Sequence, residues 1–282
     1  MVEFFQALSA PENAFLRLAL LAGLLVAVAS GIVGSYVVSR RITYIAGGVA
    51  HCVLGGIGLA VYLSVVLKWP WLHPLYGATA AALGAAAVIG LVSLRARQRE
   101  DTVISALWAV GMAAGILFIY ATPGYAVDPM VYLFGNILMV PPEDLWLIAG
   151  LDVLVLLTVL AFHKRLVAVC FDEEFARLRG VNADAYYLLL LCLTALTVVL
   201  LVTVVGIVLA IAMLALPAAV AGHFSKSLWQ MMVLAVIIGA LESALGLALS
   251  YGPNLPAGAT IVVIAGVVYL LTAVGSRLRS RA

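Results

Sequence analysis

The stretch IAGGVAHCVLGGIGLAVYLSVV, Ile45 to Val66, is apolar, rich in glycine and long enough to cross a lipid bilayer, which takes roughly 20 residues of helix. His51 is its only histidine, acidic or basic residue. An ionisable side chain in hydrocarbon is costly unless it faces a cavity or a partner, so such a residue is by default a hypothesis of function. Imidazole is also the commonest protein ligand for transition metals. The stretch therefore predicts a membrane span with a role in transport.

Composition extends this interpretation to the whole chain. Of its 282 residues, 66% are hydrophobic and 10% are charged, and the mean hydropathy is +1.20, far above that of soluble globular domains. The net charge of +2 is too small to indicate a nucleic-acid partner. The three cysteines form no CxxC pair, which argues against a zinc ribbon or a disulfide framework. We predict an all-α polytopic membrane protein, in contact with lipid, whose residues 1–282 form a single transmembrane domain.

Apolar windows of the required length number nine. They run from Leu18 to Val38, Ile45 to Val66, Leu75 to Leu94, Val103 to Tyr120, Leu145 to Phe162, Tyr186 to Val204, Gly206 to Gly222, Leu228 to Ser250 and Thr260 to Val274.

The sixth and seventh windows form one apolar block, which we divide near Gly206 because it is about twice the length of a single span. Eight helices result if this block crosses once. The apolar piece Met130 to Leu138 is too short to cross and is predicted to be re-entrant or to lie on the membrane surface.

Basic residues predict the orientation, because cytoplasmic loops are enriched in lysine and arginine. With nine crossings, an outer amino terminus and a cytoplasmic carboxyl terminus, thirteen of the fifteen basic residues lie inside and only Arg17 and Lys68 lie outside. The thirteen are Arg40, Arg41, Arg95, Arg97, Arg99, Lys164, Arg165, Arg177, Arg179, Lys226, Arg277, Arg279 and Arg281. Removing one crossing would place Lys226 and the basic tail outside, so the charge pattern favours nine.

The most hydrophilic loop, His163 to Asp184, contains FDEEFARLRGVN at Phe171 to Asn182. Its apolar residues Phe171, Phe175, Leu178 and Val181 recur at helical spacing. This pattern predicts a short amphipathic helix that ends near Gly180 and offers an apolar stripe to a cytoplasmic partner. A solvated connecting helix is the alternative.

This loop resembles the cytoplasmic coupling segment of the metal-ion ABC transporter permeases, the zinc, manganese and iron uptake family. Four more stretches fit the family in its order: GSYVVSRRITYIAGGVAH at Gly34 to His51, YLFGNIL at Tyr132 to Leu138, VGIVLAIAMLALPAAVA at Val205 to Ala221, and LSYGPNLPAGATIVV at Leu249 to Val263. The resemblance covers essentially the whole chain, and the last stretch is the most specific of them.

The resemblance implies an ABC importer permease fold in a bacterial inner or plasma membrane. It implies a homodimer of permease copies, separate cytoplasmic ATPase subunits and an extracytoplasmic metal-binding protein. In this comparison residues 163–184 form the coupling loop, with Phe171, Glu174, Arg177 and Gly180 as candidate contacts to the ATPase. The sequence lacks a GxxxxGK[ST] P-loop. It therefore predicts a non-catalytic transport subunit without a permanently bound cofactor.

Three ionisable residues lie within the predicted spans and are the candidate ligands for the transported divalent metal: His51, Asp152 and Glu242. A carboxylate with an imidazole is a plausible transient site for a transition metal. For Asp152, a structural role as a hydrogen-bonding partner between helices is an equal alternative.

The chain departs from the family pattern beside His51. The acidic residue usual four positions before the histidine is Gly47 here, and positions i and i+4 share one helix face. Glu242, Asp152 or a ligand from the second permease copy is expected to replace that acid, or the site is weaker. Cys52 is a further candidate ligand, although a free cysteine is more often a small buried hydrophobe. The glycines of this span favour close helix packing and could also line a narrow pore.

An ABC importer permease for zinc, manganese or iron is thus the leading hypothesis, and the residues do not distinguish these metals. The alternative is a secondary transporter of a cation or small solute, driven by an ion gradient through its intramembrane acids. An intramembrane metalloenzyme lacks support, because the sequence has no HExxH motif.

Overall fold

The fold comes from a computed structural model that describes residues 4, 7–8, 10, 13–69, 71–95, 100–124, 129–135, 137–253 and 255–279. Regular structure within these ranges is helical throughout, and nine of the described helices are long and apolar enough to cross a membrane. They are α2 (Ala14–Ser39), α3 (Thr43–Val66), α4 (Pro74–Arg95), α5 (Glu100–Ala121), α7 (Pro142–Phe171), α9 (Ala183–Val205), α10 (Ile207–Phe224), α11 (Leu228–Tyr251) and α12 (Ala257–Arg279).

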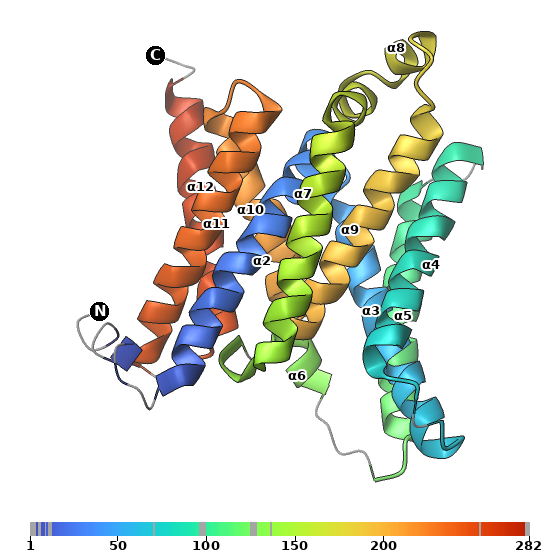
Figure 1. The fold of residues 1–282 in the computed structure, drawn as a ribbon, viewed down its shortest axis with the longest axis vertical. Coiled ribbons are helices and arrows are strands. Elements are labelled where there is room, and N and C mark those ends of the chain that lie inside the picture. The colour runs from blue at the N-terminus through green and yellow to red at the C-terminus, as the bar shows by residue number, and fades with distance from the viewer. Residues whose placement is uncertain are drawn as a thin grey trace.

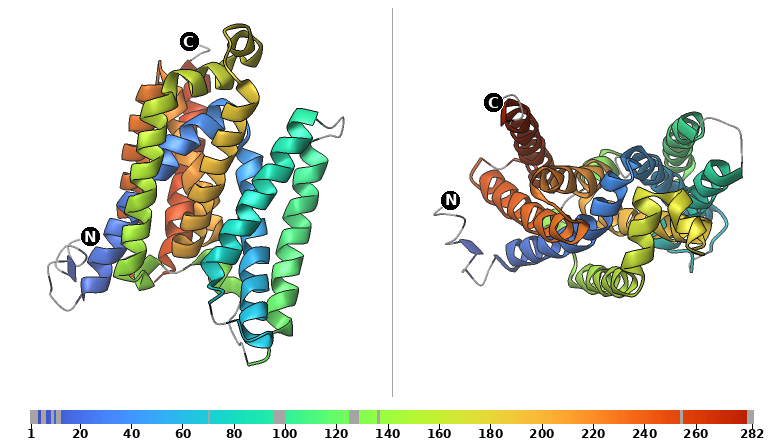
Figure 2. Two further views of the ribbon diagram at one scale, coloured as in Figure 1. Left: turned by 45° about the vertical axis from the view of Figure 1, so that its right-hand side comes forward. Right: turned by 90° about the horizontal axis from the view of Figure 1, so that it is seen from above.

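These helices form one bundle in which α2 lies between α11 and α7, while α3 packs against α4 and α5 (Figure 1). Helix α9 joins the two sides through contacts with α4, α7 and α3. The most buried helices are α2, α3 and α9, whereas α5 and α12 present most of their apolar surface outward. The view from above shows α12 and the α4–α5 pair at opposite margins (Figure 2). The helix bearing His51 is therefore central to the bundle.

The prediction of nine spans is confirmed for the described part of the chain, including the division at Gly206. This glycine separates α9 from α10 with φ +82° and ψ 165°, a region that is essentially restricted to glycine. An added Cβ on Gly206 would lie 2.3 Å from the backbone nitrogen of Gly135. The break between the two helices is thus also a point of close backbone contact.

That contact comes from the short apolar piece predicted not to cross. It forms α6 (Pro129–Phe134) and the 3-10 helix η2 (Ile137–Met139), and α6 contacts α9 and α10. Figure 1 shows α6 at the end where α2 begins, opposite the end with α8 (Glu173–Leu178). Helix α12 ends on the side of α8, as nine crossings require. The predicted cytoplasmic residues Arg97, Arg99 and Arg281 lie outside the described ranges.

One predicted boundary is wrong. The fifth span was expected to end at Phe162 and to be followed by a loop from His163, but α7 continues without interruption to Phe171. Lys164 and Arg165 end the apolar window without ending the helix, since both residue types have good helix propensity. Hydropathy therefore located the apolar part of α7 and missed its last turns.

Candidate functional site

His51 lies in the middle of α3 and is buried, with 8% of its surface exposed. Its ring stacks on the indole of Trp108 from α5, with 4.5 Å between ring centroids and 21° between the planes. The Nδ1 atom of His51 has no hydrogen-bond partner in the described structure. The imidazole is thus held by an aromatic contact, while one ring nitrogen stays available.

Gly47, at the position where the family pattern has an acid, lies against the same indole. A Cβ added there would lie 2.9 Å from Cζ3 of Trp108, closer than side-chain atoms normally approach. The Trp108 ring therefore occupies the space that a carboxylate at position 47 would need. On this face of α3, Trp108 thus lies where the resemblance predicts an acid beside His51.

The other two candidate ligands are buried on different helices. Glu242 of α11 is 3% exposed and Asp152 of α7 is 8% exposed. No described group makes a hydrogen bond of good geometry with either carboxylate, although the Ala29 backbone of α2 lies beside the carboxylate of Asp152. No salt bridge joins either carboxylate to His51 among the described side chains. Helix α11 packs on α2, α10 and α12, whereas α3 packs chiefly on α4 and α5. Among the described residues no three His, Cys, Asp or Glu side chains gather as a metal site.

Within one protomer, His51, Asp152 and Glu242 thus do not form a common site. Their role as metal ligands stays a prediction.

Cys52 points into the contact between α3 and α5. Its thiol donates a hydrogen bond to the carbonyl oxygen of Leu107, with 3.3 Å from Sγ to oxygen. This contact favours a packing role for the thiol.

The glycines of α3 have a packing role. A Cβ on Gly56 would lie 2.1 Å from the carbonyl oxygen of Gly77 on α4, and one on Gly58 would lie 2.5 Å from that of Gly115 on α5. Only glycine permits such approaches between backbones. Close contact with α4 and α5 thus explains these two glycines directly.

The candidate coupling segment consists of the end of α7, helix α8 and the turn into α9. Asp172 caps α8 by accepting a hydrogen bond from the Phe175 N–H at 2.8 Å, and Gly180 forms the following turn with φ +77°. The expected single helix starting at Phe171 is therefore corrected: Phe171 is the last residue of α7, and Asp172 separates the two helices. Three of the four residues of the expected apolar stripe are exposed, with 67% of Phe171, 49% of Phe175 and 87% of Leu178 accessible. The fourth, Val181, is partly buried and packs against the core.

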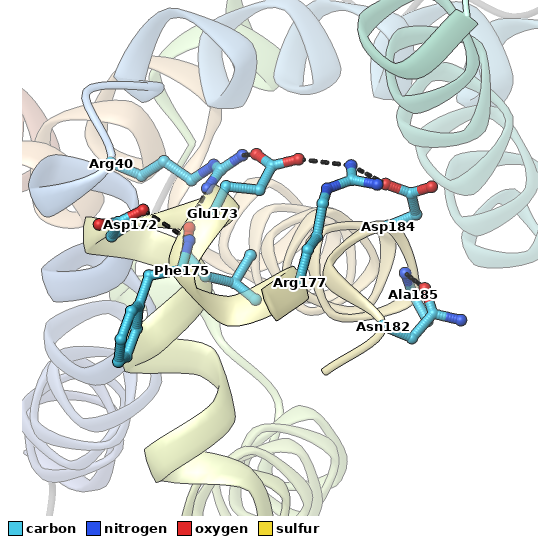
Figure 3. Close-up of polar contacts among 9 residues, drawn as sticks. Arg40, Asp172, Glu173, Phe175, Arg177, Asn182, Asp184 and Ala185 are labelled. Atoms are coloured by element: carbon cyan, nitrogen blue, oxygen red, sulfur yellow. Dashed lines mark hydrogen bonds and ion pairs between the residues drawn. The ribbon is translucent and has the colours of Figure 1, made fainter. Parts of the chain in front are cut away.

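A chain of ion pairs holds α8 against the rest of the protein (Figure 3). Glu173 accepts hydrogen bonds from Arg40 at 2.7 Å and from Arg177 at 2.8 Å, and Arg177 also pairs with Asp184 of α9. Arg40, directly after α2, donates to the carbonyl of Val169 and lies over the Tyr187 ring. The hydrogen bond from Arg177 and the contacts with Arg40 outweigh the opposite effect of partial burial, so the pKa of Glu173 lies below its usual range.

Glu174, its neighbour, is exposed and belongs to no ion pair among the described side chains. The two charged coupling candidates therefore differ: Glu174 is available to a partner, while Arg177 is engaged within the protein.

Comparison with known proteins identifies the family of this chain. Residues 12–276 match the ABC 3 transport family. The chain belongs to that family. The match covers the nine spans described above, and the family predicted from the motifs is confirmed. As a permease of this family, the protein is a transport component and not an enzyme.

Individual members of this family are similar to the chain over most of their length. The chain is 41% identical to a probable metal transport system membrane protein of Chlamydia trachomatis, over 90% of this chain and 86% of the relative. It is 32% identical to the manganese import system permease protein ScaB of Streptococcus parasanguinis, over 92% and 89% of the two chains. Among solved structures, PsaBC from Streptococcus pneumoniae in complex with Fab superposes with a TM-score of 0.83 at 32% identity, covering 96% of this chain and 94% of that one.

Sequence reasoning missed three residues of this family member that the structure brings into view: Trp108, Arg40 and Glu173. The Arg40–Glu173 pair spans 133 positions, and nothing local in the sequence indicates it. The only signal for Trp108 was a tryptophan inside a predicted span, away from the membrane interfaces where tryptophan is enriched.

Proposed function

We propose that this chain is the membrane-spanning permease of an ATP-driven importer for a divalent transition metal, with manganese as the favoured cargo. The observation that carries the proposal is similarity over nearly the full length to permeases named for manganese import, together with a TM-score of 0.83 to PsaBC. Zinc and iron are the competing cargoes, because imidazole and carboxylate ligands serve all three metals.

The proposed assembly contains two permease copies in lipid, two cytoplasmic ATPase subunits and an extracytoplasmic metal-binding protein. The exposed stripe of Phe171, Phe175 and Leu178 supports an ATPase contact at α8. Most basic residues flank the helix ends on the side of α8, which supports a cytoplasmic position for this end. The amino terminus is then outside.

We place the coupling route along the ion pairs of α8. Glu173 binds Arg40, and Arg40 lies three residues before the start of α3, the helix that bears His51. A displacement of α8 by the ATPase is therefore transmitted through Arg40 to the α2–α3 corner. Glu174 and the apolar stripe contact the ATPase, while Arg177 and Gly180 fix the position of α8.

His51 is the proposed ligand of the transported metal, because its Nδ1 is unpartnered in a buried, central position. Glu242, Asp152 or a residue of the second copy completes the site during transport. Since Trp108 fills the space at Gly47, the site has one carboxylate fewer than the family pattern. It should hold metal more weakly than sites with both ligands.

The test is uptake by proteoliposomes that contain the permease, its ATPase and its binding protein. We expect ATP-dependent uptake of Mn²⁺ that persists when the proton gradient is collapsed, and weaker uptake of Zn²⁺ and Fe²⁺ in competition. An ATPase partner with its P-loop lysine replaced should abolish uptake. Uptake that follows the proton gradient and ignores ATP would establish the secondary-transporter alternative instead.

The α8 contact is tested separately. Glu174→Ala and Leu178→Ala should reduce ATPase binding without altering the fold, since both side chains are exposed. Full ATPase binding by both variants would remove the proposed contact.

A further inference from the structure

A cavity lies at the end of the bundle opposite α8. It has a volume of about 230 Å³ and is formed by the start of α4, helix α6, the start of α7 and the last turns of α9. Most of its wall is apolar, and four of its lining residues have polar side chains: His73, Tyr132, Asp144 and Thr203. An apolar cavity with a few convergent polar groups is the usual form of a small-ligand site.

The polar groups are of the kind that binds divalent transition metals. His73 supplies an imidazole and Asp144 a carboxylate, and the two are near enough for their charges to interact. No salt bridge joins these two described side chains, so space remains between them. A water occupies about 30 Å³, so the cavity can hold an ion with several of its waters.

Each of the two residues also has a local role that must be weighed against binding. The Nδ1 atom of His73 accepts the N–H of Leu75 at 3.2 Å at the start of α4, and Asp144 lies in the first turn of α7, where acids are favoured by the helix dipole. A neutral imidazole has one ring lone pair, so a metal ion would displace the Leu75 N–H. That hydrogen bond is long and therefore weak. A metal ion can displace it at low cost, and the hydrogen bond re-forms when the ion leaves.

The position of the cavity links it to His51. Ile57 of α3 forms part of the cavity wall and lies six residues after His51 on the same helix. At about 1.5 Å of rise per residue, the two levels are separated by roughly 9 Å along the helix axis. Thr203 and Val204 of the wall immediately precede the break at Gly206. The cavity therefore lies about 9 Å from the level of His51 along α3, on the predicted outer side, and Ile57 and His51 are rotated by roughly 240° about the helix axis. An ion leaving the cavity for His51 must pass around α3 as well as along it.

We propose that His73 and Asp144, with hydroxyl oxygens of Tyr132 or Thr203 and water, form an outer receiving site that briefly holds the divalent metal before it passes to His51. Only two strong ligands are present, so the site is weak and releases its ion readily. The proposal rests on the proposed import function and adds an entry site to it.

The direct test measures Mn²⁺ binding to the purified permease in nanodiscs. Bound Mn²⁺ is measured as the loss of the electron paramagnetic resonance signal of free Mn²⁺. A His51→Leu background removes the central ligand, so the remaining specific binding reports on the outer site. His73→Asn keeps an acceptor at the place of Nδ1 for the Leu75 N–H, and Asp144→Asn keeps the shape of the carboxylate. Each change should weaken the remaining binding at least tenfold. Asp101→Asn changes an exposed acid at the start of α5, far from the cavity wall, and should change the binding less than twofold.

Equal Mn²⁺ binding by the two cavity variants and the Asp101→Asn control would overturn the receiving site. A fall in melting temperature without a change in binding would mean that His73 and Asp144 serve only the local structure. A change in affinity for the metal-binding protein alone would assign the cavity to docking, and would equally overturn the proposal.

Transport separates this proposal from the import function. In proteoliposomes with an otherwise unaltered permease, His73→Asn and Asp144→Asn should raise the half-saturating Mn²⁺ concentration severalfold and leave the maximal rate near that of the unaltered protein. If the unaltered permease imports no metal, the proposed function fails. If it imports Mn²⁺ and both variants match it at low Mn²⁺, only the receiving site fails.

Discussion

The Arg40–Glu173 ion pair should hold α8 in place, and Glu173→Gln tests this with little change of shape. Glu173 has 31% of its side chain exposed and Arg40 has 17%, so the pair is neither a free surface pair nor a fully buried one. Exposed pairs contribute about 0.2–1 kcal/mol, and hydrogen bonds to partly buried charged groups about 1.5–3 kcal/mol. We therefore expect the Arg40–Glu173 interaction to contribute about 1–2 kcal/mol to the docking of α8.

The i,i+4 pair of Glu173 with Arg177 serves as the internal comparison. Arg177 is 50% exposed, and helical pairs of this kind contribute only about 0.3–0.5 kcal/mol. Most of the effect of Glu173→Gln should therefore come from the lost contact to Arg40. Removing Arg177 also breaks its pair with Asp184, so a double-mutant cycle of Glu173 with Arg177 isolates the i,i+4 pair. This cycle should give a smaller coupling energy than the cycle of Glu173 with Arg40.

Amide hydrogen exchange across α8 measures this, because exchange there reports local opening. A loss of 1–2 kcal/mol corresponds to exchange about 5- to 30-fold faster. A double-mutant cycle with Arg40→Gln and Glu173→Gln isolates the pair, and Glu174→Gln, which breaks no ion pair, is the matched control with less than twofold change. A coupling energy below about 0.3 kcal/mol, or equal effects of Glu173→Gln and Glu174→Gln, would refute the reasoning.

Three further outcomes are expected. The pKa of Glu173 is lowered in the folded protein, so the stabilisation that its carboxylate gives to α8 is fully present above the unfolded pKa of about 4.3 and is lost as the pH falls through the folded pKa. Amide exchange in α8, corrected for intrinsic exchange rates, should therefore rise only below about pH 4.3. Glu173→Gln should abolish this rise. Gly206→Ala should destabilise the protein by more than about 2 kcal/mol in thermal unfolding. Gly150→Ala, inside α7 and with no atom within 4 Å of the added Cβ, should instead be neutral or stabilise the protein by up to about 1 kcal/mol. His51→Leu should reduce Mn²⁺ uptake at least tenfold with assembly intact, and normal uptake would make His51 a packing residue.

The number and order of spans could be predicted because hydropathy depends on residues close together in the sequence. The break at Gly206 was predicted from length and charge parity, and its backbone angles confirm it. The end of α7 was wrong for a definite reason: a charged residue marks the end of the apolar window, while a helix ends where its backbone hydrogen bonding stops. Asp172, with extended backbone angles, is that point.

The site was less predictable because its contacts are tertiary. The stacking of His51 on Trp108 and the Arg40–Glu173 pair join helices that are distant in the chain. A single sequence shows which side chains are unusual in a membrane span, and it identified His51, Asp152 and Glu242. It does not show which of them meet, and in the protomer they remain apart.

Burial without a partner is itself an argument about these three residues. A buried polar group without a hydrogen bond costs about 1–3 kcal/mol, and His51, Asp152 and Glu242 each carry such atoms. They lie on α3, α7 and α11, so no single network satisfies them within one protomer. Leucine at these positions would avoid that cost. Under the proposed function, the metal ion or groups from a second copy would supply the missing partners during transport, and this would give the cost a physical reason.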